Sequence, residues 1–284
     1  SQWLTLVDAE QASQEAGQKL AQAGLLFAQA GWASPPKWCA ALVDQLVQTP
    51  WFGTHLTRLV RGEDNWCLYL QGQQIGVKVF DGVVLCNAND AKQQLPALAL
   101  PLKSIRGQVT YLQGLEAPAR VVCGDGYVTP AKAGSMAVGA SYNLTGSSPE
   151  LDVQDHLGNL QRLQRLMPAS TLTTRHIQGG RVGFRATTPD YLPMVGQLAD
   201  ADTLLTRFAH LRKDKNYRFT ESMPWLSGLY INAGHGSKGL ITAPLAAELL
   251  AAQISGEVLP MSRHVAAALE PNRFFLRDMM RRKR

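Results

Sequence analysis

The sequence has few cysteines and no long apolar run, and each absence excludes a class of protein. Its 284 residues include four cysteines, and no two of them form a CxxC pair. This spacing argues against a disulfide framework or a zinc site, so we expect buried free thiols. No apolar run approaches the roughly 18 residues that span a bilayer, and the polar start does not resemble a signal peptide. We therefore expect a soluble, cytoplasmic protein with no membrane partner.

The positive charge of the chain is concentrated in two short segments. The chain has 28 basic and 22 acidic residues, for a formal net charge of +6. Residues 203–226 hold five basic and two acidic side chains, and residues 272–284 hold six basic and one acidic. Basic segments can bind nucleic-acid phosphates, whereas a solvated loop and a solvated tail are the alternative. The residues that we expect to contact nucleic acid are Arg212, Lys213, Lys215, Arg281, Arg282, Lys283 and Arg284.

Helix-like and strand-like stretches alternate along the chain. Helical patterns open at Asp8 with a capping box and extend to about Gly24, open again at Ser34, and cover residues 151–166. The strand-like stretches are a hairpin over residues 66–79, a run at 82–86 typical of a strand buried on both faces, and several short runs over 106–142. The pattern predicts a mixed α/β fold with an added antiparallel sheet.

A strand, a glycine-rich turn and a helix follow one another near the C-terminus. Residues 229–232 form the expected strand, residues 233–239 read Ala-Gly-His-Gly-Ser-Lys-Gly, and the expected helix ends at Ser255-Gly256. The glycines let a ligand approach the backbone, and the N–H groups at a helix start favour negative charge. The spacing is not that of a P-loop. The turn is therefore either an anion or cofactor site or an ordinary connection.

A longer motif around this turn carries a family resemblance. Residues 183–196 read Gly-Phe-Arg-Ala-Thr-Thr-Pro-Asp-Tyr-Leu-Pro-Met-Val-Gly, and together with the turn they resemble the D-amino-acid oxidase and glycine oxidase family of FAD enzymes. The further matching segments are residues 106–109, 125–130, 138–142, 8–13, 31–32 and 269–273. Together they narrow the resemblance to the oxidase half of bifunctional tRNA-modifying enzymes. This resemblance covers nearly the whole chain. It implies a partial FAD-binding domain of the glycine oxidase type and an antiparallel substrate-domain sheet.

The resemblance also implies how these domains alternate. We expect residues 1–33 and 99–180 to belong to the substrate domain, and residues 34–98 and 181–262 to belong to the FAD domain. Residues 263–284 are expected to form a basic C-terminal tail.

The same resemblance assigns roles to single residues. Arg185 and Tyr127 would hold the substrate carboxylate, since a planar guanidinium can bind two oxygens at once. A surface ion pair for Arg185 and a core position for Tyr127 are the alternatives. The expected FAD contacts are Gly234, His235, Gly236, Ser237, Lys238, Gly239 and Leu240. The turn has no cysteine, so we expect FAD to be bound non-covalently, and the scattered histidines predict no metal site.

The function implied is FAD-dependent removal of the carboxymethyl group from 5-carboxymethylaminomethyl-(2-thio)uridine at the tRNA wobble position, giving 5-aminomethyl-(2-thio)uridine and glyoxylate. The implied partners are tRNA and a methyltransferase half of the same polypeptide. An oxidase of free glycine, sarcosine or a D-amino acid and a catalytically incompetent fragment remain as alternatives. Enzymes of this family begin their flavin domain with a βαβ unit that carries GxGxxG, and this sequence contains no such motif. We therefore expect that a preceding segment is missing and that this chain alone binds FAD weakly or not at all.

Overall fold

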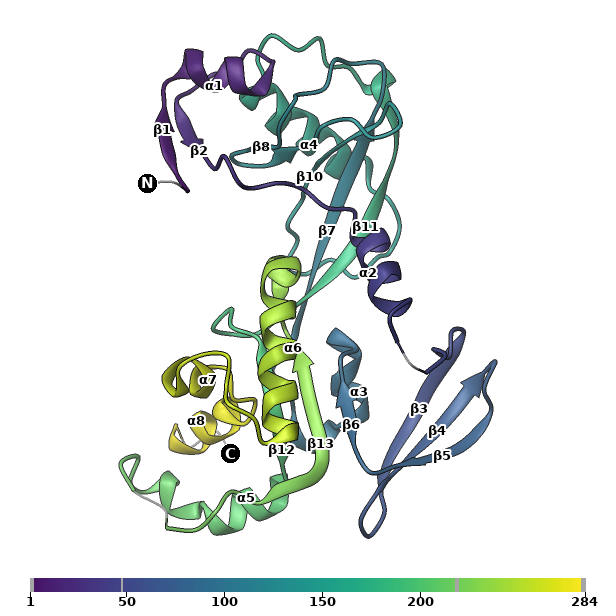
Figure 1. The fold of residues 1–284 in the computed structure, drawn as a ribbon, viewed down its shortest axis with the longest axis vertical. Helices are drawn as coiled ribbons and strands as arrows, with labels where there is room; N and C mark the ends of the chain where they lie inside the picture. The colour runs from purple at the N-terminus through teal and green to yellow at the C-terminus, as the bar shows by residue number, and fades with distance from the viewer. Residues whose placement is uncertain (1–2, 47, 218–219, 282–284) are drawn as a thin grey trace. The chain divides into compact units, whose positions relative to one another are not determined.

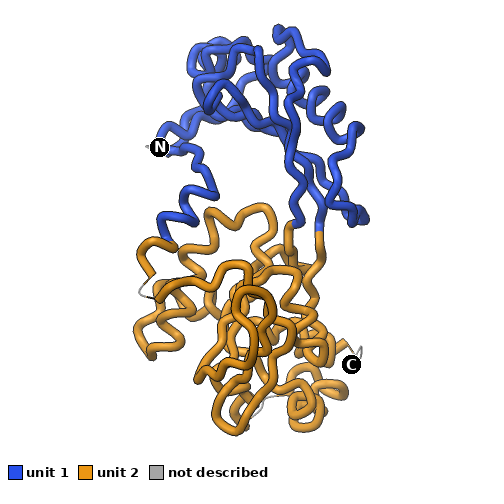
Figure 2. The backbone as a smooth tube through the Cα atoms, turned by 90° about the vertical axis from the view of Figure 1, so that its right-hand side faces the viewer, with its two compact units in different colours: residues 1–42, 105–184 blue, residues 43–104, 185–284 orange. Residues whose placement is uncertain are grey.

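The chain folds into two compact units, each built from two separate stretches of sequence (Figure 2). The structure is a computed structural model that describes residues 3–46, 48–217 and 220–281. Unit 1 comprises residues 1–42 and 105–184, and unit 2 comprises residues 43–104 and 185–284. The sequence predicted that the chain passes from one domain to the other at residues 33/34, 98/99 and 180/181. The assignment of the units to substrate and flavin stays a prediction.

Unit 1 is built on a five-stranded sheet with the order β11-β7-β10-β9-β8 (Figure 1). Its strands are β7 (Lys103–Leu112), β8 (Val122–Cys123), β9 (Tyr127–Val128), β10 (Met136–Gly139) and β11 (Ile177–Thr187). The pairs β7–β10, β10–β9 and β9–β8 are antiparallel, which confirms the predicted antiparallel sheet. Helix α4 (Val153–Leu166) buries Leu160 and Leu163 in one cluster with Leu112, Val128 and Val138 of the sheet. A 3-10 turn, η3 (Thr174–His176), precedes β11.

The N-terminal part of unit 1 is a two-stranded ribbon with a short helix. Strands β1 (Thr5–Val7) and β2 (Gly24–Leu26) pair antiparallel, and α1 (Ala9–Ala16) lies between them in sequence. The Asp8 side chain accepts a hydrogen bond from Gln11 N at 2.8 Å, as a cap requires. The predicted extension to Gly24 is wrong, because Gly17 adopts φ +62° and closes the helix. The next helix, α2 (Pro35–Val43), begins with the expected prolines.

Unit 2 contains two three-stranded sheets. One has the order β12-β13-β6 and is formed by β12 (Met194–Ala199), β13 (Trp225–Ala233) and β6 (Val83–Leu85). The other has the order β3-β4-β5, with β3 (Thr54–Arg61), β4 (Trp66–Gly72) and β5 (Gly76–Phe80), and confirms the predicted hairpin. The helical segments of this unit are η1 (Ala88–Asp90), α3 (Ala91–Gln94), η2 (Pro96–Leu98), α5 (Ala201–Arg207), η4 (Ala209–Arg212), η5 (Gly236–Lys238), α6 (Gly239–Ser255), α7 (Arg263–Ala268) and α8 (Arg273–Met280).

Strand β6 lies at an open edge of its sheet. It pairs in parallel with β13, as expected for residues 82–86, and no strand of the described chain pairs with its other side. Leu85 is buried, but Val84 is 41% exposed. The expectation of burial on both faces is therefore wrong, because the face of β6 that carries Leu85 is buried while the face that carries Val84 is open to solvent.

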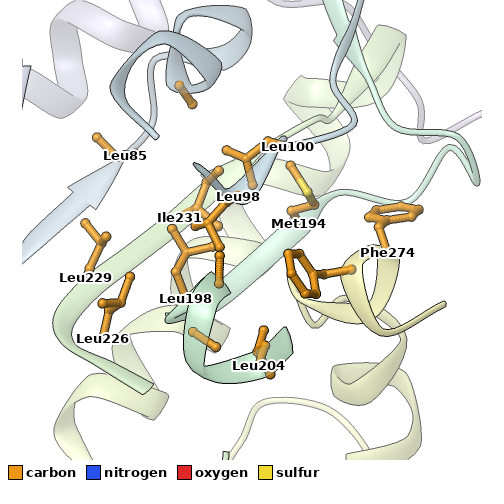
Figure 3. Close-up of a cluster of buried hydrophobic side chains, with 14 of the residues drawn as sticks. Leu85, Leu98, Leu100, Met194, Leu198, Leu204, Leu226, Leu229, Ile231 and Phe274 are labelled. Atoms are coloured by element: carbon orange, nitrogen blue, oxygen red, sulfur yellow. The ribbon is translucent and has the colours of Figure 1, made fainter. Parts of the chain in front are cut away.

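The core of unit 2 joins its parallel strands to the C-terminal helices (Figure 3). Leu229 and Ile231 of β13 are fully buried in the same cluster as Met194 and Phe274. Helix α6 packs on β12 and β13. Residues 263–280 contain helices α7 and α8. Because Phe274 and Met279 of α8 are buried in this core, the segment belongs to the fold of unit 2. The predicted separate tail is corrected to this extent, and Arg282, Lys283 and Arg284 lie outside the described residues.

The cysteines differ from the expectation of buried thiols. All four are free, but Cys39, Cys86 and Cys123 are exposed and Cys67 is half-buried. In the part of the chain that the structure describes, no helix combines the length and apolar character needed to cross a membrane.

Candidate functional site

The glycine-rich turn after β13 is packed so closely that one of its positions must be glycine. Gly234 is buried and has φ +85°, and a Cβ placed there would lie 2.7 Å from Thr188 Cγ2 and 3.2 Å from Leu102 Cδ2. Gly236 has φ +57°, and a Cβ there would lie 3.4 Å from Thr187 Oγ1. The turn therefore lies directly against the end of β11 and the residues that follow it.

The start of α6 has no capping side chain. Lys238 occupies the N-cap position without a side-chain hydrogen bond to the helix, and Ser237, Lys238 and Leu240 are exposed. The N–H groups of a first helical turn have no partner within the helix, so an uncapped start can donate to the negative edge of a ligand. Gly236 and Gly239 leave the backbone beside this helix start without side chains, whereas Gly234 is packed against the protein. The expected contact of these residues with FAD stays a prediction.

His235 is fixed within this turn by both ring nitrogens. Nδ1 lies 2.8 Å from Thr242 Oγ1, and Nε2 lies 2.9 Å from Asn232 Oδ1. Burial lowers the pKa of His235, because removal from water disfavours the charged imidazolium. A neutral ring held between two side chains orders the turn and is a poor candidate for a general acid.

Arg185 lies close in the chain to the contact between β11 and the turn. Thr187 pairs with His235 in an isolated β-bridge, and Arg185 precedes Thr187 by two residues. Alternate residues of a strand share one face, so Arg185 lies on the face of β11 that carries Thr187. Its side chain is half-buried. The structure thus places the predicted carboxylate clamp and the glycine-rich turn in the same unit.

Tyr127, the other predicted carboxylate ligand, is a half-buried residue of β9 in unit 1. Arg185 belongs to unit 2. The joint grip of these two residues on one carboxylate therefore stays a prediction.

An ion pair that no sequence motif predicts supports the segment between β11 and β12. Arg273 Nε donates to Asp190 Oδ2 and its Nη2 donates to Asp190 Oδ1, each at 3.0 Å, and Nη2 also donates to Leu192 O at 2.9 Å. Burial raises the pKa of Asp190, but the hydrogen bonds from Arg273, Leu192 and Thr188 outweigh it, so the pKa is lowered. Arg273 therefore fixes the segment that carries Thr188, on which Gly234 packs.

The motif at residues 106–109 has a structural place in unit 1. Arg106 is buried and forms an ion pair with Asp155, while its Nε donates to Ser148 O at 2.8 Å. The Gln108 side chain exchanges two hydrogen bonds of 2.8 Å with the backbone of Asp152. This motif holds the loop before α4 and is scaffold.

The two basic segments are neighbours in unit 2, although more than fifty residues of sequence separate them. Helix α8 packs against η4, which ends at Arg212, and Figure 1 shows α8 beside α5 and the segment that follows it. Lys213, Lys215 and Arg281 are exposed. Close to them, the rings of His210 and Tyr217 stack with centroids 4.9 Å apart. Their contact with RNA stays a prediction.

Metal ligands are not gathered at this site. Among the residues with described positions, no group of three or more His, Cys, Asp or Glu side chains could hold a metal ion.

Comparison with known proteins agrees with these features. Residues 2–253 match the DAO family, described as FAD dependent oxidoreductase. The chain is 41% identical over 288 residues to the tRNA 5-methylaminomethyl-2-thiouridine biosynthesis bifunctional protein MnmC of Pseudomonas aeruginosa strain UCBPP-PA14, covering 98% of this chain and 43% of that protein. The MnmC protein of Ectopseudomonas mendocina strain ymp is 39% identical over 282 residues, covering 95% of this chain and 42% of that protein. The chain thus spans less than half the length of these relatives.

The fold is similar to those of solved amine-oxidising enzymes. Glycine oxidase from Geobacillus kaustophilus gives a TM-score of 0.74 at 16% identity, covering 95% of this chain and 67% of that one. Iminodiacetate oxidase from Chelativorans sp. BNC1 gives a TM-score of 0.65 at 18% identity, covering 94% and 67%. The predicted fold class and the predicted family of FAD enzymes are confirmed.

Proposed function

Because the chain belongs to the DAO family of FAD-dependent oxidoreductases, we propose that it oxidises a carboxymethylamino group on the wobble uridine of tRNA. The substrate is 5-carboxymethylaminomethyl-(2-thio)uridine, and the products are the 5-aminomethyl form and glyoxylate. The observation that carries this proposal is the 41% identity, over 98% of the chain, to a protein named for the biosynthesis of 5-methylaminomethyl-2-thiouridine in tRNA. A methyltransferase half on the same polypeptide is the proposed partner that consumes the amine.

The proposed substrate is an N-substituted glycine, and the site suits such a group. Its carboxylate carries a fixed charge next to the reacting C–H bond, so a bidentate cation can orient that bond. Arg185 is that cation, on the face of β11 that carries Thr187, and Tyr127 is the proposed second ligand. Iminodiacetate, the compound for which the oxidase of similar fold is named, is itself an N-carboxymethyl amine. This shared chemistry supports an N-carboxymethyl amine as the substrate.

The reaction balances as a two-electron oxidation followed by hydrolysis. FAD, when bound, supplies the acceptor for the hydride that leaves the carbon next to the amine, and molecular oxygen is the proposed reoxidant. The amine nitrogen loses its proton, a C=N bond forms, and water cleaves it to the primary amine and glyoxylate. The turn at Gly234–Gly239 and the uncapped start of α6 stabilise negative charge on the bound cofactor. Arg185 holds the carboxylate throughout.

The neighbouring basic segments support a tRNA substrate. Lys213, Lys215 and Arg281 can neutralise phosphates, and the stacked His210 and Tyr217 rings offer a surface for an unpaired base. An enzyme for a free amino acid has no use for this surface.

Two other readings follow from specific observations. The fold similarity to glycine oxidase favours a free small amine as substrate. The open edge of β6, together with the absence of GxGxxG, favours a chain that cannot load FAD by itself. A nucleoside digest separates the tRNA substrate from a free small amine. After incubation with the enzyme, tRNA that carries the carboxymethylaminomethyl group contains the 5-aminomethyl nucleoside only if tRNA is the substrate.

The carboxylate clamp is tested by Arg185→Lys in the flavin-loaded longer polypeptide that carries this chain. Lysine keeps the charge but loses the bidentate fork, so stopped-flow flavin reduction should slow by about a hundredfold. Arg181→Lys, an exposed position on the same strand, is the matched control and should reduce flavin at the wild-type rate. Equal rates for Arg185→Lys and Arg181→Lys would refute the clamp.

A further inference from the structure

Unit 1 contains a cavity that the proposed reaction does not use. It has a volume of about 420 Å³, opens to solvent and is lined entirely by residues of unit 1. One wall is formed by α1 and the ribbon of β1 and β2, and the other by the segment around β8 and the end of α4. Its apolar lining includes the buried Val7, Ala12 and Ala16 and the half-buried Leu20 and Leu166. Sites for small molecules typically have this size and this apolar lining.

The residues that line the cavity have a net charge of one positive unit. Its charged lining consists of three arginines and two acids. Arg120 pairs with Glu15 at 2.8 Å and Arg165 pairs with Asp125 at 3.2 Å. Both pairs are well exposed, so water screens them and each pair is neutral. The surplus charge belongs to the third arginine, Arg162.

Arg162 has a neutral partner and no acid. Its Nη1 donates to Asn159 Oδ1 at 3.2 Å, and no carboxylate among the residues that the structure describes lies within ion-pair distance of it. Asn159 is fully buried, and its amide nitrogen donates to Gln108 O and Thr110 Oγ1, each at 3.0 Å. The guanidinium is therefore anchored at one nitrogen, while its charge is uncompensated beside an apolar cavity.

The β8–β9 turn packs against this arginine through Gly126 and against the neighbouring Leu166 through Gly124. A Cβ at Gly126 would lie 2.6 Å from Gly139 O and 3.3 Å from Arg162 Cδ, and a Cβ at Gly124 would lie 2.5 Å from Leu166 Cδ2. The turn thus packs directly on the arginine stem. A positioned stem reduces the rotamer entropy that a guanidinium loses when it binds an anion.

We propose that this cavity is a second ligand site, which takes an organic anion with one charged end and an apolar or aromatic body, and that Arg162 binds its carboxylate or phosphate. A buried apolar wall beside one uncompensated guanidinium matches a molecule with one charged end. The shared chemistry has two sources, a free small molecule and a nucleotide of an RNA. This proposal does not rest on the turn at Gly234, and Tyr127 of the proposed reaction pairs with Cys123 of the cavity wall.

Cys123 provides a readout, because it lines the cavity and its thiol is exposed. Alkylation of the 284-residue chain by iodoacetamide is followed by mass spectrometry in the presence of benzoate or uridine 5′-monophosphate. We expect either probe to slow the alkylation of Cys123 at least threefold, in a saturable manner, and to leave Cys86 unchanged. Cys86 is exposed too but lies in unit 2, so it serves as an internal control.

Three variants separate a built site from general charge attraction. Arg162→Gln keeps a donor for Asn159 but removes the charge, and should raise the probe concentration that gives half-maximal protection of Cys123 at least tenfold. Arg175→Gln removes the same charge from an exposed position of unit 1 and should have no effect. Ala12→Phe fills the cavity from α1 and should abolish protection even if Arg162→Gln fails to fold. Protection of Cys123 that is absent in the wild type, or that Arg175→Gln weakens as much as Arg162→Gln, would overturn the proposal.

A third arm identifies the source of the anion. A short RNA that displaces benzoate from Cys123 supports an RNA phosphate or nucleotide as occupant. An RNA that leaves benzoate bound supports a free small anion. Both outcomes keep Arg162 as the anion ligand.

Discussion

Replacing Gly234 by alanine tests how tightly the glycine-rich turn is packed. The substitution adds one methyl group at φ +85°, 2.7 Å from Thr188 Cγ2 and 3.2 Å from Leu102 Cδ2. Left-handed backbone costs a residue with a Cβ about 1–2 kcal/mol. Forcing a methyl group into a packed core costs about 1–3 kcal/mol more. We therefore expect Gly234→Ala to lower the free energy of unfolding of unit 2 by about 2–5 kcal/mol.

Gly256→Ala isolates the backbone part of this cost. Gly256 has φ +71°, lies in the same unit at the end of α6, and has no atom within 4 Å of a Cβ placed there. Its substitution should cost about 1–2 kcal/mol, the backbone part alone. Urea unfolding of both variants, followed by tryptophan fluorescence, gives the two free energies.

Thr188→Ser then isolates the steric part. Serine lacks the Cγ2 methyl group but keeps the hydroxyl that donates to Leu192 O at 2.6 Å. Combined with Gly234→Ala it should recover about 1 kcal/mol or more relative to the sum of the single changes, since neighbouring sites couple. If Gly234→Ala costs no more than Gly256→Ala and shows no coupling to Thr188→Ser, the close packing of the turn is refuted.

The remaining predictions concern cofactor, RNA and pH. The chain alone should lose FAD on dialysis, since its sequence has no GxGxxG motif to bind the FAD pyrophosphate; a flavin spectrum at full stoichiometry would contradict this. Neutralising Lys213, Lys215 and Arg281 should flatten the log–log salt dependence of tRNA affinity by about 0.7–0.9 per lost phosphate contact, and superimposable slopes would leave these residues as solvated surface. Asp190 has a lowered pKa when folded, so its stabilisation is present above its unfolded pKa and is lost as the pH falls through the folded value. The difference in urea midpoint between wild type and Asp190→Asn should therefore shrink below about pH 4, and a difference independent of pH would exclude this linkage.

The sequence predicted the parts of the fold that depend on local pattern. The strand, glycine turn and helix at residues 225–255 appear as β13, η5 and α6, because glycines, periodicity and the stop at Gly256 all act within a few residues. A local signal also explains why helix α1 is shorter than the sequence predicts. Gly17 closes α1 with φ +62°, although apolar periodicity continues beyond it.

Contacts between distant segments could not be predicted in this way. The ion pair of Arg273 with Asp190 joins positions 83 residues apart, and nothing in either local sequence marks the partner. The sequence marks Arg273 as one charge of a basic tail and as the end of a matching segment at residues 269–273, and neither feature predicts its partner. The burial of Phe274 and Met279 shows that this tail is a packed helix, because its apolar face completes the core of unit 2. The packing of α8 against η4, which makes neighbours of the two basic segments, is equally invisible in composition.

The arrangement of unit 2 separates cofactor retention from substrate orientation. Arg185 and the turn at Gly234 are fixed by the end of β11, by Thr188 and by Arg273, all within this unit. Strand β6 forms the opposite edge of this sheet, and β13 lies between β6 and β12. A strand added at β6 would extend the parallel sheet without touching the bonds that hold Arg185 and the turn. The contacts that hold the proposed carboxylate clamp therefore lie within unit 2 and do not involve the edge of β6.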